Sequence, residues 1–260
     1  MRLKEQFKDI GEKDLKLLRN SYDVVGDIAI LEIDPKLKKY EKKIANEVLK
    51  FKNVNTVVKK EGGHEGIYRL QKYKFLAGEN KRETIYRENG VIVKLDIEKT
   101  YFSPRLSNER MRIAKQVKDC EDVLVMFSGC GVYQLVIAKN SRAREIYGVE
   151  INKDACKYAE ENVALNKIKK IKLFCMDVNK FKINKKFDRI VMPLPKGGEQ
   201  FLGCAKRFSK KGTVIHFYTT SGSDFRGNIK TVFKGFKILS VVKCGQISSR
   251  VYRLCIDFKV

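Results

Sequence analysis

The chain has 260 residues, with 55 lysines and arginines against 31 aspartates and glutamates, which gives a formal charge of +24 and a pI of about 9.7. Its length suffices for one large domain with a smaller attachment. The N-terminus lacks the apolar stretch of a signal peptide and no run reaches the length of a membrane helix, so we expect a soluble, cytoplasmic protein. The excess of positive charge indicates a polyanionic partner such as nucleic acid.

The first hundred residues predict a small α+β module. An amphipathic helix is expected at 36–51, where Leu37, Tyr40, Ile44 and Val48 form one apolar stripe. It is preceded by the β-like run "VVGDIAILEI" and followed by "NTVVKK" and "GVIVKLDI". No flexible linker follows. We therefore place an N-terminal module at 1–105 and a second domain at 106–260.

From residue 122 onward, short apolar runs alternate with helical patterns: "DVLVMF", "VYQLVIAK", "EIYGVE", "KDACKYAEENVALN", "IKLFCM" and "FDRIVM". A helix near 199–208 and the strand "GTVIHFYTT" continue the series. This alternation predicts an α/β fold with a doubly wound, Rossmann-like sheet. The last two runs, "KILSVVKC" and "RVYRLCIDFKV", follow each other without a helix and predict an antiparallel hairpin at the sheet edge. That ending resembles the class I methyltransferase sheet.

Seven cysteines are spread along the chain without a CxxC pair, and only two histidines accompany them. This spacing argues against a zinc site and against a disulfide framework. Several lie in apolar runs, where free thiols pack as small hydrophobic groups. Runs such as "LFCM" and "RLCIDF" therefore favour buried free thiols, and a reducing cytoplasm is the natural compartment. The seven positions are Cys120, Cys130, Cys156, Cys175, Cys204, Cys244 and Cys255.

The segment "VLVMFSGCGVYQ" predicts a nucleotide-binding turn. Gly129 and Gly131 follow a predicted strand and precede a helix, and Glu150 ends the next strand, where an acid can accept both hydroxyls of a ribose. The third glycine of the dinucleotide motif would fall at Gln134, whose bulk disfavours a pyrophosphate. S-adenosylmethionine (AdoMet) has no pyrophosphate and is favoured over NAD. Asp177 ends the following strand, where it can bond the adenine amino group, although a helix cap or a solvated strand end would also place acids at such positions.

Several motifs together resemble the archaeal and eukaryotic tRNA (guanine-37-N1)-methyltransferase family. They are "EGIYRLQKYKFLAGENKRETIYRENGVIVKLDIEKTYFSPRLSNER", "FSGCG", "YGVEIN", "MDV" and "VMPLPKGGEQFL". The stretch "YFSPRL..ER" is the most specific of them. Relatives of this family methylate the tricyclic wyosine precursor or transfer an aminocarboxypropyl group from AdoMet. The resemblance implies AdoMet as cofactor and the tRNA anticodon stem-loop as partner. We expect a monomer, because the sequence has no extra apolar helix stripe that would need a partner.

The resemblance also implies a role for each matching residue. Glu109 would be the general base on guanine N1, and Arg69 would stabilise the charge that builds at O6. Tyr101 and Arg110 would complete the catalytic pocket, and no metal is implied. The cofactor side would comprise Arg105, Phe127, Gly129, Gly131, Glu150, Asp177, Pro193 and Pro195, with the Pro193–Pro195 loop also lying against the target base.

Three features depart from the family pattern. Val125 stands where the family commonly has aspartate, and "PLP" replaces the usual Asn-Leu-Pro or Asn-Pro-Pro loop. We also expect no N-terminal domain that reads the tRNA elbow. The first two departures bear on fine specificity and the third on how tRNA is checked.

The proposed chemistry sets a demand on Glu109. Guanine N1 carries a proton, so a carboxylate must take it, and desolvation would raise the pKa of that carboxyl group toward neutrality. An arginine beside the carboxylate would oppose this, so we expect the neighbouring guanidinium to be directed at O6 rather than at Glu109. Without the resemblance, Glu109 would be read as a first-turn acid of a helix capped by Ser107.

Two other hypotheses stay open. One is a wyosine-pathway enzyme that acts on the tricyclic base. The other is a non-catalytic, basic RNA-binding protein, which the Val125 and Pro193 departures favour. Lysine clusters at "DPKLKKYEKK", "VNKFKINKK" and "RFSKKG" are candidate phosphate contacts and predict salt-dependent binding in each case. We expect His64 and His216 to be structural or exposed.

Overall fold

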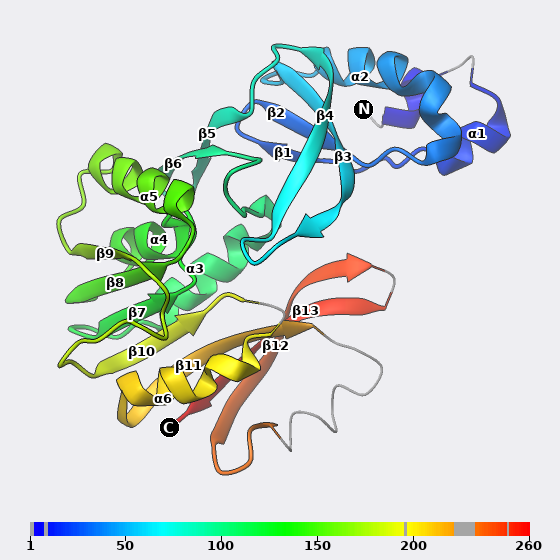
Figure 1. The fold of residues 1–260 in the computed structure, drawn as a ribbon. Helices are drawn as coiled ribbons and strands as arrows, with labels where there is room; N and C mark the ends of the chain where they lie inside the picture. Colours follow the sequence, from blue (N-terminus) through cyan, green and yellow to red (C-terminus); the bar gives the residue numbers. More distant parts are fainter. Residues whose placement is uncertain (1–2, 8–9, 195–196, 221–231, 249) are drawn as a thin grey trace. The chain divides into compact units, whose positions relative to one another are not determined.

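The computed structural model describes residues 3–7, 10–194, 197–220, 232–248 and 250–260 (Figure 1). The chain forms two compact units, of which the first comprises Met1–Arg87 and Ile92–Pro104 and the second Glu88–Val91 and Arg105–Val260. The short piece of the second unit, 88–91, is the tip of the two-stranded sheet formed by β5 (Glu83–Glu88) and β6 (Val91–Asp96). Among the described residues, no helix has both the length and the apolarity needed to cross a membrane.

The first unit carries a four-stranded sheet in the order β1-β2-β3-β4. Strands β2 and β3 pair in parallel and the other neighbours pair antiparallel. The helix predicted at 36–51 is present, but its first turns are a 3-10 helix. The elements are η1 (Leu3–Gln6), α1 (Glu12–Leu17), β1 (Asp23–Val25), β2 (Ile28–Leu31), η2 (Pro35–Tyr40), α2 (Glu41–Leu49), β3 (Thr56–Glu65) and β4 (Leu70–Gly78).

The core of the first unit forms as the apolar stripe predicts. Leu37, Ile44 and Val48 are each at most 1% exposed and pack in one cluster with Ala29 and Val57 of the sheet. The turn between β1 and β2 requires Gly26, whose φ is +60°, because a Cβ there would lie 2.1 Å from Thr84 Oγ1.

The second unit contains a seven-stranded sheet in the order β12-β13-β11-β10-β7-β8-β9. Strands β7 to β11 run parallel, while β13 is antiparallel to both β11 and β12. The predicted fold class and terminal hairpin are therefore confirmed. The elements are η3 (Pro104–Leu106), α3 (Ser107–Gln116), β7 (Asp122–Met126), α4 (Val132–Asn140), β8 (Glu145–Glu150), α5 (Lys153–Leu165), β9 (Ile171–Cys175), β10 (Phe187–Met192), η4 (Glu199–Phe201), α6 (Leu202–Phe208), β11 (Ser209–Thr220), β12 (Lys237–Ser248) and β13 (Val251–Lys259).

The two faces of this sheet differ. On one face, Leu124 and Met126 of β7 join an apolar cluster with Ala205 and Phe208 of α6. Successive residues of a strand point to opposite faces, so Val123 and Val125 lie on the other one, which α3, α4 and α5 cover in a contiguous row (Figure 1). All five residues of β7 are buried, as expected for a central parallel strand covered on both sides.

The loops that follow the parallel strands meet at one edge of the sheet. Strands β7, β8, β9 and β10 end at Met126, Glu150, Cys175 and Met192. In open α/β sheets, ligands bind outside the carboxyl ends of the strands. The residues that directly follow these strand ends are therefore the first candidates for a site.

Candidate active site

The turn between β7 and α4 has an unusual backbone. Phe127, Gly129 and Gly131 have φ values of 57°, 55° and 87°, in the left-handed region. Glycine adopts this region freely, whereas a phenylalanine there costs about 1–3 kcal/mol, a strain typical of functional sites. At Gly131 a Cβ would also lie 3.3 Å from Ala159 Cβ of α5. The turn is therefore sharp and closely packed, and its backbone is tied down by hydrogen bonds from Ser128 N–H to the Val149 carbonyl and from Gly131 N–H to the Ser128 carbonyl.

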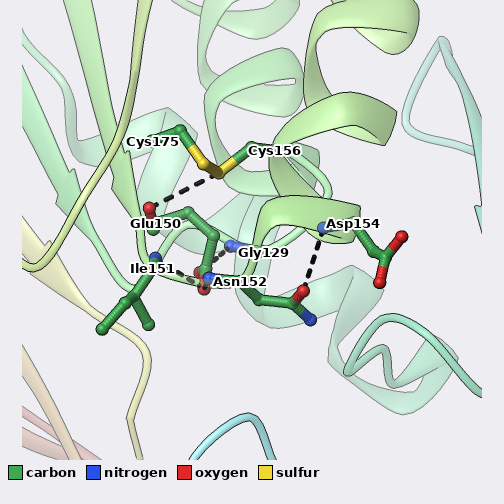
Figure 2. Close-up of a disulfide and its surroundings, with 7 residues drawn as sticks. All are labelled: Gly129, Glu150, Ile151, Asn152, Asp154, Cys156 and Cys175. Atoms are coloured by element: carbon green, nitrogen blue, oxygen red, sulfur yellow. Dashed lines mark hydrogen bonds between the residues drawn. A yellow bond between two sulfur atoms is a disulfide. The ribbon is translucent and has the colours of Figure 1, made fainter.

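Glu150 at the end of β8 organises this turn (Figure 2). One carboxylate oxygen accepts the backbone N–H of Gly129 at 2.7 Å, and the other accepts those of Ile151 and Asn152 at 2.9 and 2.8 Å. The side chain is only partly buried. Because a carboxylate offers about four lone-pair directions, Glu150 retains capacity for a ligand hydroxyl. The acid thus fixes the glycine loop and stays available at the edge.

The other predicted cofactor residues lie along the same edge. Asp177 follows β9 and accepts the N–H of Asn179 through Oδ1 at 2.8 Å, so it caps a turn, which leaves Oδ2 for a ligand amino group. Pro193 directly follows β10, whereas Pro195 lies outside the described residues. Gln134 is fully buried and its Nε2 fills the space over Gly148, where a Cβ would lie 2.2 Å away. The bulky residue is thus accommodated by a glycine on β8.

A disulfide joins Cys156 of α5 to Cys175 of β9 (Figure 2). The expectation of a free thiol in the run "LFCM" is therefore wrong for Cys175. The two positions are 19 residues apart without a recognisable motif, and only the packing of α5 beside β9 brings them together. The bridge lies next to Glu150, since Cys156 Sγ is 3.4 Å from the Glu150 carbonyl oxygen and Cys175 is the register partner of Glu150. It therefore braces the segment that carries the acid.

Glu109 lies in the first turn of α3 and is 5% exposed. Arg112, one turn further along the helix, donates to both of its carboxylate oxygens at 2.7 Å, and Tyr218 Oη donates to Oε1 at 2.6 Å. Tyr218 is near the end of β11, whose Phe217 pairs with Met192 just before Pro193. Glu109 therefore lies at the carboxyl edge of the sheet, as a residue that reacts with a ligand there must.

The expected arrangement of arginines around Glu109 is wrong. The nearest guanidinium is that of Arg112, and it is directed at Glu109 itself. Arg110 is 2% exposed and forms a bidentate pair with Glu88 of the β5–β6 tip. The expected cap is also absent, because Leu106 precedes the helix and Ser107 accepts hydrogen bonds from Asn89. Arg112 was not among the predicted site residues, although its i+3 spacing from Glu109 on a predicted helix places the two side chains together.

Behind Arg112 lies a buried polar network. Asp257 of β13 accepts from Arg112 Nη1 at 2.6 Å and from His216 Nδ1 at 2.7 Å, and His216 Nε2 contacts Arg189 Nη1 at 2.7 Å. Arg189 in turn pairs with Glu121. Although Asp257, His216 and Cys255 bring their ligand atoms within 4.8 Å of one another, guanidinium groups occupy the surroundings where a cation would sit. The sequence signal for this network was polar residues in apolar strands, "VIHFY" and "LCIDF".

Two predicted catalytic residues belong to the first unit. The guanidinium of Arg69 lies over the ring of Tyr101, 5.1 Å from its centroid, and His64 contacts the same ring edge-on at 5.1 Å. Arg69 has a φ of 56° at the end of the β3–β4 turn, and its backbone carbonyl contacts His64 Nδ1 at 3.0 Å. Together they line a small pocket of the first unit. Arg105 is exposed in η3 of the second unit.

Comparison with known families accounts for this set of residues. The TRM5/TYW2 methyltransferase domain model matches residues 84–244, and a TYW2 N-terminal domain model matches residues 3–81. The chain belongs to the TRM5/TYW2 methyltransferase family. Methyltransferases of this family use AdoMet. The sharp glycine turn and the acid at the end of β8 fit a ribose and a methionine moiety without a pyrophosphate, as expected for AdoMet.

Relatives of known activity cover most of the chain. The tRNA (guanine(37)-N(1))-methyltransferase Trm5b of Pyrococcus abyssi is 38% identical over an alignment of 255 residues that covers 94% of this chain and 76% of the relative. The tRNA 4-demethylwyosine(37)-methyltransferase Taw21 of Saccharolobus solfataricus is 34% identical over 91% of this chain and 92% of the relative. The structure of a complex of aTrm5 and tRNALeu matches with a TM-score of 0.88 at 33% identity, over 99% of this chain and 76% of that one.

Proposed function

We propose that this TRM5/TYW2 family member is an AdoMet-dependent tRNA (guanine-37-N1)-methyltransferase. The observation that carries the proposal is Glu109, a buried carboxylate at the ligand edge of a class I methyltransferase sheet, the same edge that carries the glycine turn and Glu150. The Pyrococcus relative that shares 38% of the residues carries this activity in its name. The charge of +24 and the exposed lysines suit the tRNA anticodon stem-loop as substrate.

Glu109 would supply the proton acceptor that the reaction requires. Bound AdoMet would supply an electrophilic methyl group, whose transfer to guanine N1 breaks the carbon–sulfur bond and leaves a neutral thioether, while the proton of N1 would pass to a Glu109 oxygen. Negative charge that develops at O6 calls for a cation, which we assign to Arg69, with Tyr101 holding its guanidinium. Glu150 and Asp177 would bind the ribose and adenine, and Pro193 would border the target base. Guanine must leave its stack to reach such a site, which costs little in an anticodon loop.

A second candidate is methylation of the tricyclic wyosine precursor at the same position. One observation favours it: the Saccharolobus relative is named for methylation of 4-demethylwyosine. The two reactions use the same cofactor site and differ in the base that reaches it. Pro193 stands where the resemblance led us to expect an asparagine side chain, so we expect the pocket for the target base to decide between the two substrates.

Transfer of a labelled methyl group to defined tRNAs tests the proposal. The substrates are a transcript with guanine at position 37, one with adenine there, and a tRNA that carries 4-demethylwyosine, and the product nucleosides are identified by mass. N1-methylguanosine formed only from the guanine transcript supports the proposal. Transfer only to the tricyclic base supports the second candidate, and a mass gain of an aminocarboxypropyl group identifies a different reaction. AdoMet binding without any transfer rejects all three.

A further inference from the structure

The guanidinium of Arg112 is shared by two buried carboxylates. Its Nε and Nη2 contact Glu109 at 2.7 Å, and its Nη1 contacts Asp257 Oδ2 at 2.6 Å. Glu109 and Asp257 are 5% and 2% exposed. A cation paired with a single carboxylate strongly favours the ionised form and makes the carboxylate a poor base. A second carboxylate on the same cation changes this balance.

Asp257 is fixed in its ionised form by further donors. Besides Arg112 it accepts from Ser240 Oγ at 2.9 Å and from Gln116 Nε2 at 3.3 Å. Because an arginine only donates, His216 Nε2 accepts from Arg189, and Nδ1 therefore carries the proton that is donated to Asp257. Burial raises the pKa of Asp257, but the bonds from His216 and Arg112 outweigh it and hold the pKa well below its usual range. Burial lowers the pKa of His216, which is thus neutral.

The charges of the network leave one negative charge in excess. Glu109, Asp257 and Glu121 are negative, Arg112 and Arg189 are positive, and His216 is neutral. A proton on Glu109 removes the excess and leaves Arg112 paired with Asp257 alone. Without Asp257, the same proton would leave a partly buried guanidinium without a carboxylate partner, which is unfavourable.

We propose that Asp257 is a positioning residue that preserves the proton affinity of Glu109 by taking over the charge of Arg112 when guanine N1 gives up its proton. Arg112 orients the Glu109 carboxylate before the reaction. Asp257 shares the charge of Arg112, so that the pairing does not abolish the basicity of Glu109. The inference rests on the proposed role of Glu109 as base. The other titratable groups around Glu109 are neutral at physiological pH, because burial raises the pKa values of Tyr133, Tyr218, Cys244 and Cys255.

Two substitutions that should shift the pH dependence of kcat in opposite directions test the inference. Asp257→Asn leaves Arg112 entirely to Glu109, so the acid limb of the kcat profile moves to lower pH by about one unit and the plateau kcat falls about tenfold, while KM for AdoMet and tRNA stays unchanged. Arg112→Gln keeps donors for both carboxylates but removes the cation, so the acid limb moves to higher pH. The control is Asp188→Asn, which removes a carboxylate of the same unit that pairs with Lys210, away from Glu109.

A direct titration separates this inference from the proposed function. In protein labelled with carbon-13 at the glutamate carboxyl groups, the Glu109 signal is assigned by its absence in Glu109→Gln. The titration midpoint of this signal moves to lower pH in Asp257→Asn and to higher pH in Arg112→Gln, whether or not the variants turn over substrate. Unmoved midpoints in either folded variant overturn the inference, even if methyl transfer is confirmed. Should one variant fail to fold, the other still decides, and full activity of Glu109→Gln would reject the base assignment alone.

Discussion

Glu109 and Glu150 are two carboxylates at the same edge of one sheet, yet they are held in different ways. Glu150 accepts three backbone N–H groups, which are neutral and rigid. Glu109 is held by side chains, a guanidinium and a phenol, and is the more deeply buried of the two. Backbone donors fix the position of an acid without adding charge, which suits a hydrogen-bond acceptor. A shared cation can shift between carboxylates, which suits a group that must take up a proton.

The largest effect should come from removing the charge at Glu109. Glu109→Gln keeps the side-chain size and an acceptor for Arg112 but cannot take the proton of N1, so we expect kcat to fall by roughly 10²–10⁴-fold. Equilibrium binding of AdoMet and tRNA should persist, because Glu150 and the glycine turn are untouched. Single-turnover methyl transfer combined with calorimetry measures both quantities. Loss of AdoMet binding in this variant would show that Glu109 also holds the cofactor, which would contradict the separate roles of Glu109 and Glu150.

Removing the disulfide should affect the Glu150 region alone. A crosslink that closes a loop of about 20 residues contributes about 3 kcal/mol, so Cys156→Ala with Cys175→Ala should lower the Tm by roughly 6–12 °C. Affinity for AdoMet should weaken by a smaller factor, because the bridge braces the segment that carries Glu150.

Calorimetric melting with and without a reductant checks this effect. The control is Cys120→Ser, which removes an exposed free thiol and should melt as the wild type does. Equal melting of oxidised and reduced protein would contradict a stabilising role for the bridge. A displaced acid limb of kcat would show that the bridge also reaches Glu109.

The same contrast explains what the sequence could predict. The surroundings of Glu150 are local: two of its donors are adjacent in the chain and the third follows the preceding strand. Strand, turn and acid could therefore be predicted from periodicity and spacing. The partners of Glu109 are remote, since Tyr218 is 109 positions away and Asp257 is 145 from Arg112. Such contacts depend on the order of strands in the sheet, and no local pattern records them.

Glu150→Gln should weaken the binding of AdoMet without changing the proton uptake of Glu109. The amide loses the charge that strengthens hydrogen bonds to ribose hydroxyls, worth about 2 kcal/mol, so Kd for AdoMet should rise about 30-fold. The acid limb of kcat at saturating AdoMet should stay in place. Glu145→Gln, at the opposite end of β8, is the matched control and should bind AdoMet normally. An unchanged Kd in Glu150→Gln would mean that this acid serves only the loop.

The smallest effect concerns the far end of the Glu109 network, and it should appear in stability rather than activity. Burial lowers the pKa of His216, so below about pH 6.5 the unfolded chain binds a proton that the folded chain refuses. The free energy of unfolding should therefore fall as pH drops from 6.5, by at most about 1.4 kcal/mol per unit. His216→Gln should flatten this slope in urea titrations between pH 5 and 7, whereas His64→Gln, which removes the exposed histidine of the first unit, serves as the control. An equal slope in wild type and His216→Gln would mean that the pKa of the buried histidine is the same in the folded and unfolded chain. The network behind Glu109 could then gain a positive charge, which the Glu150 site, held by backbone amides, cannot.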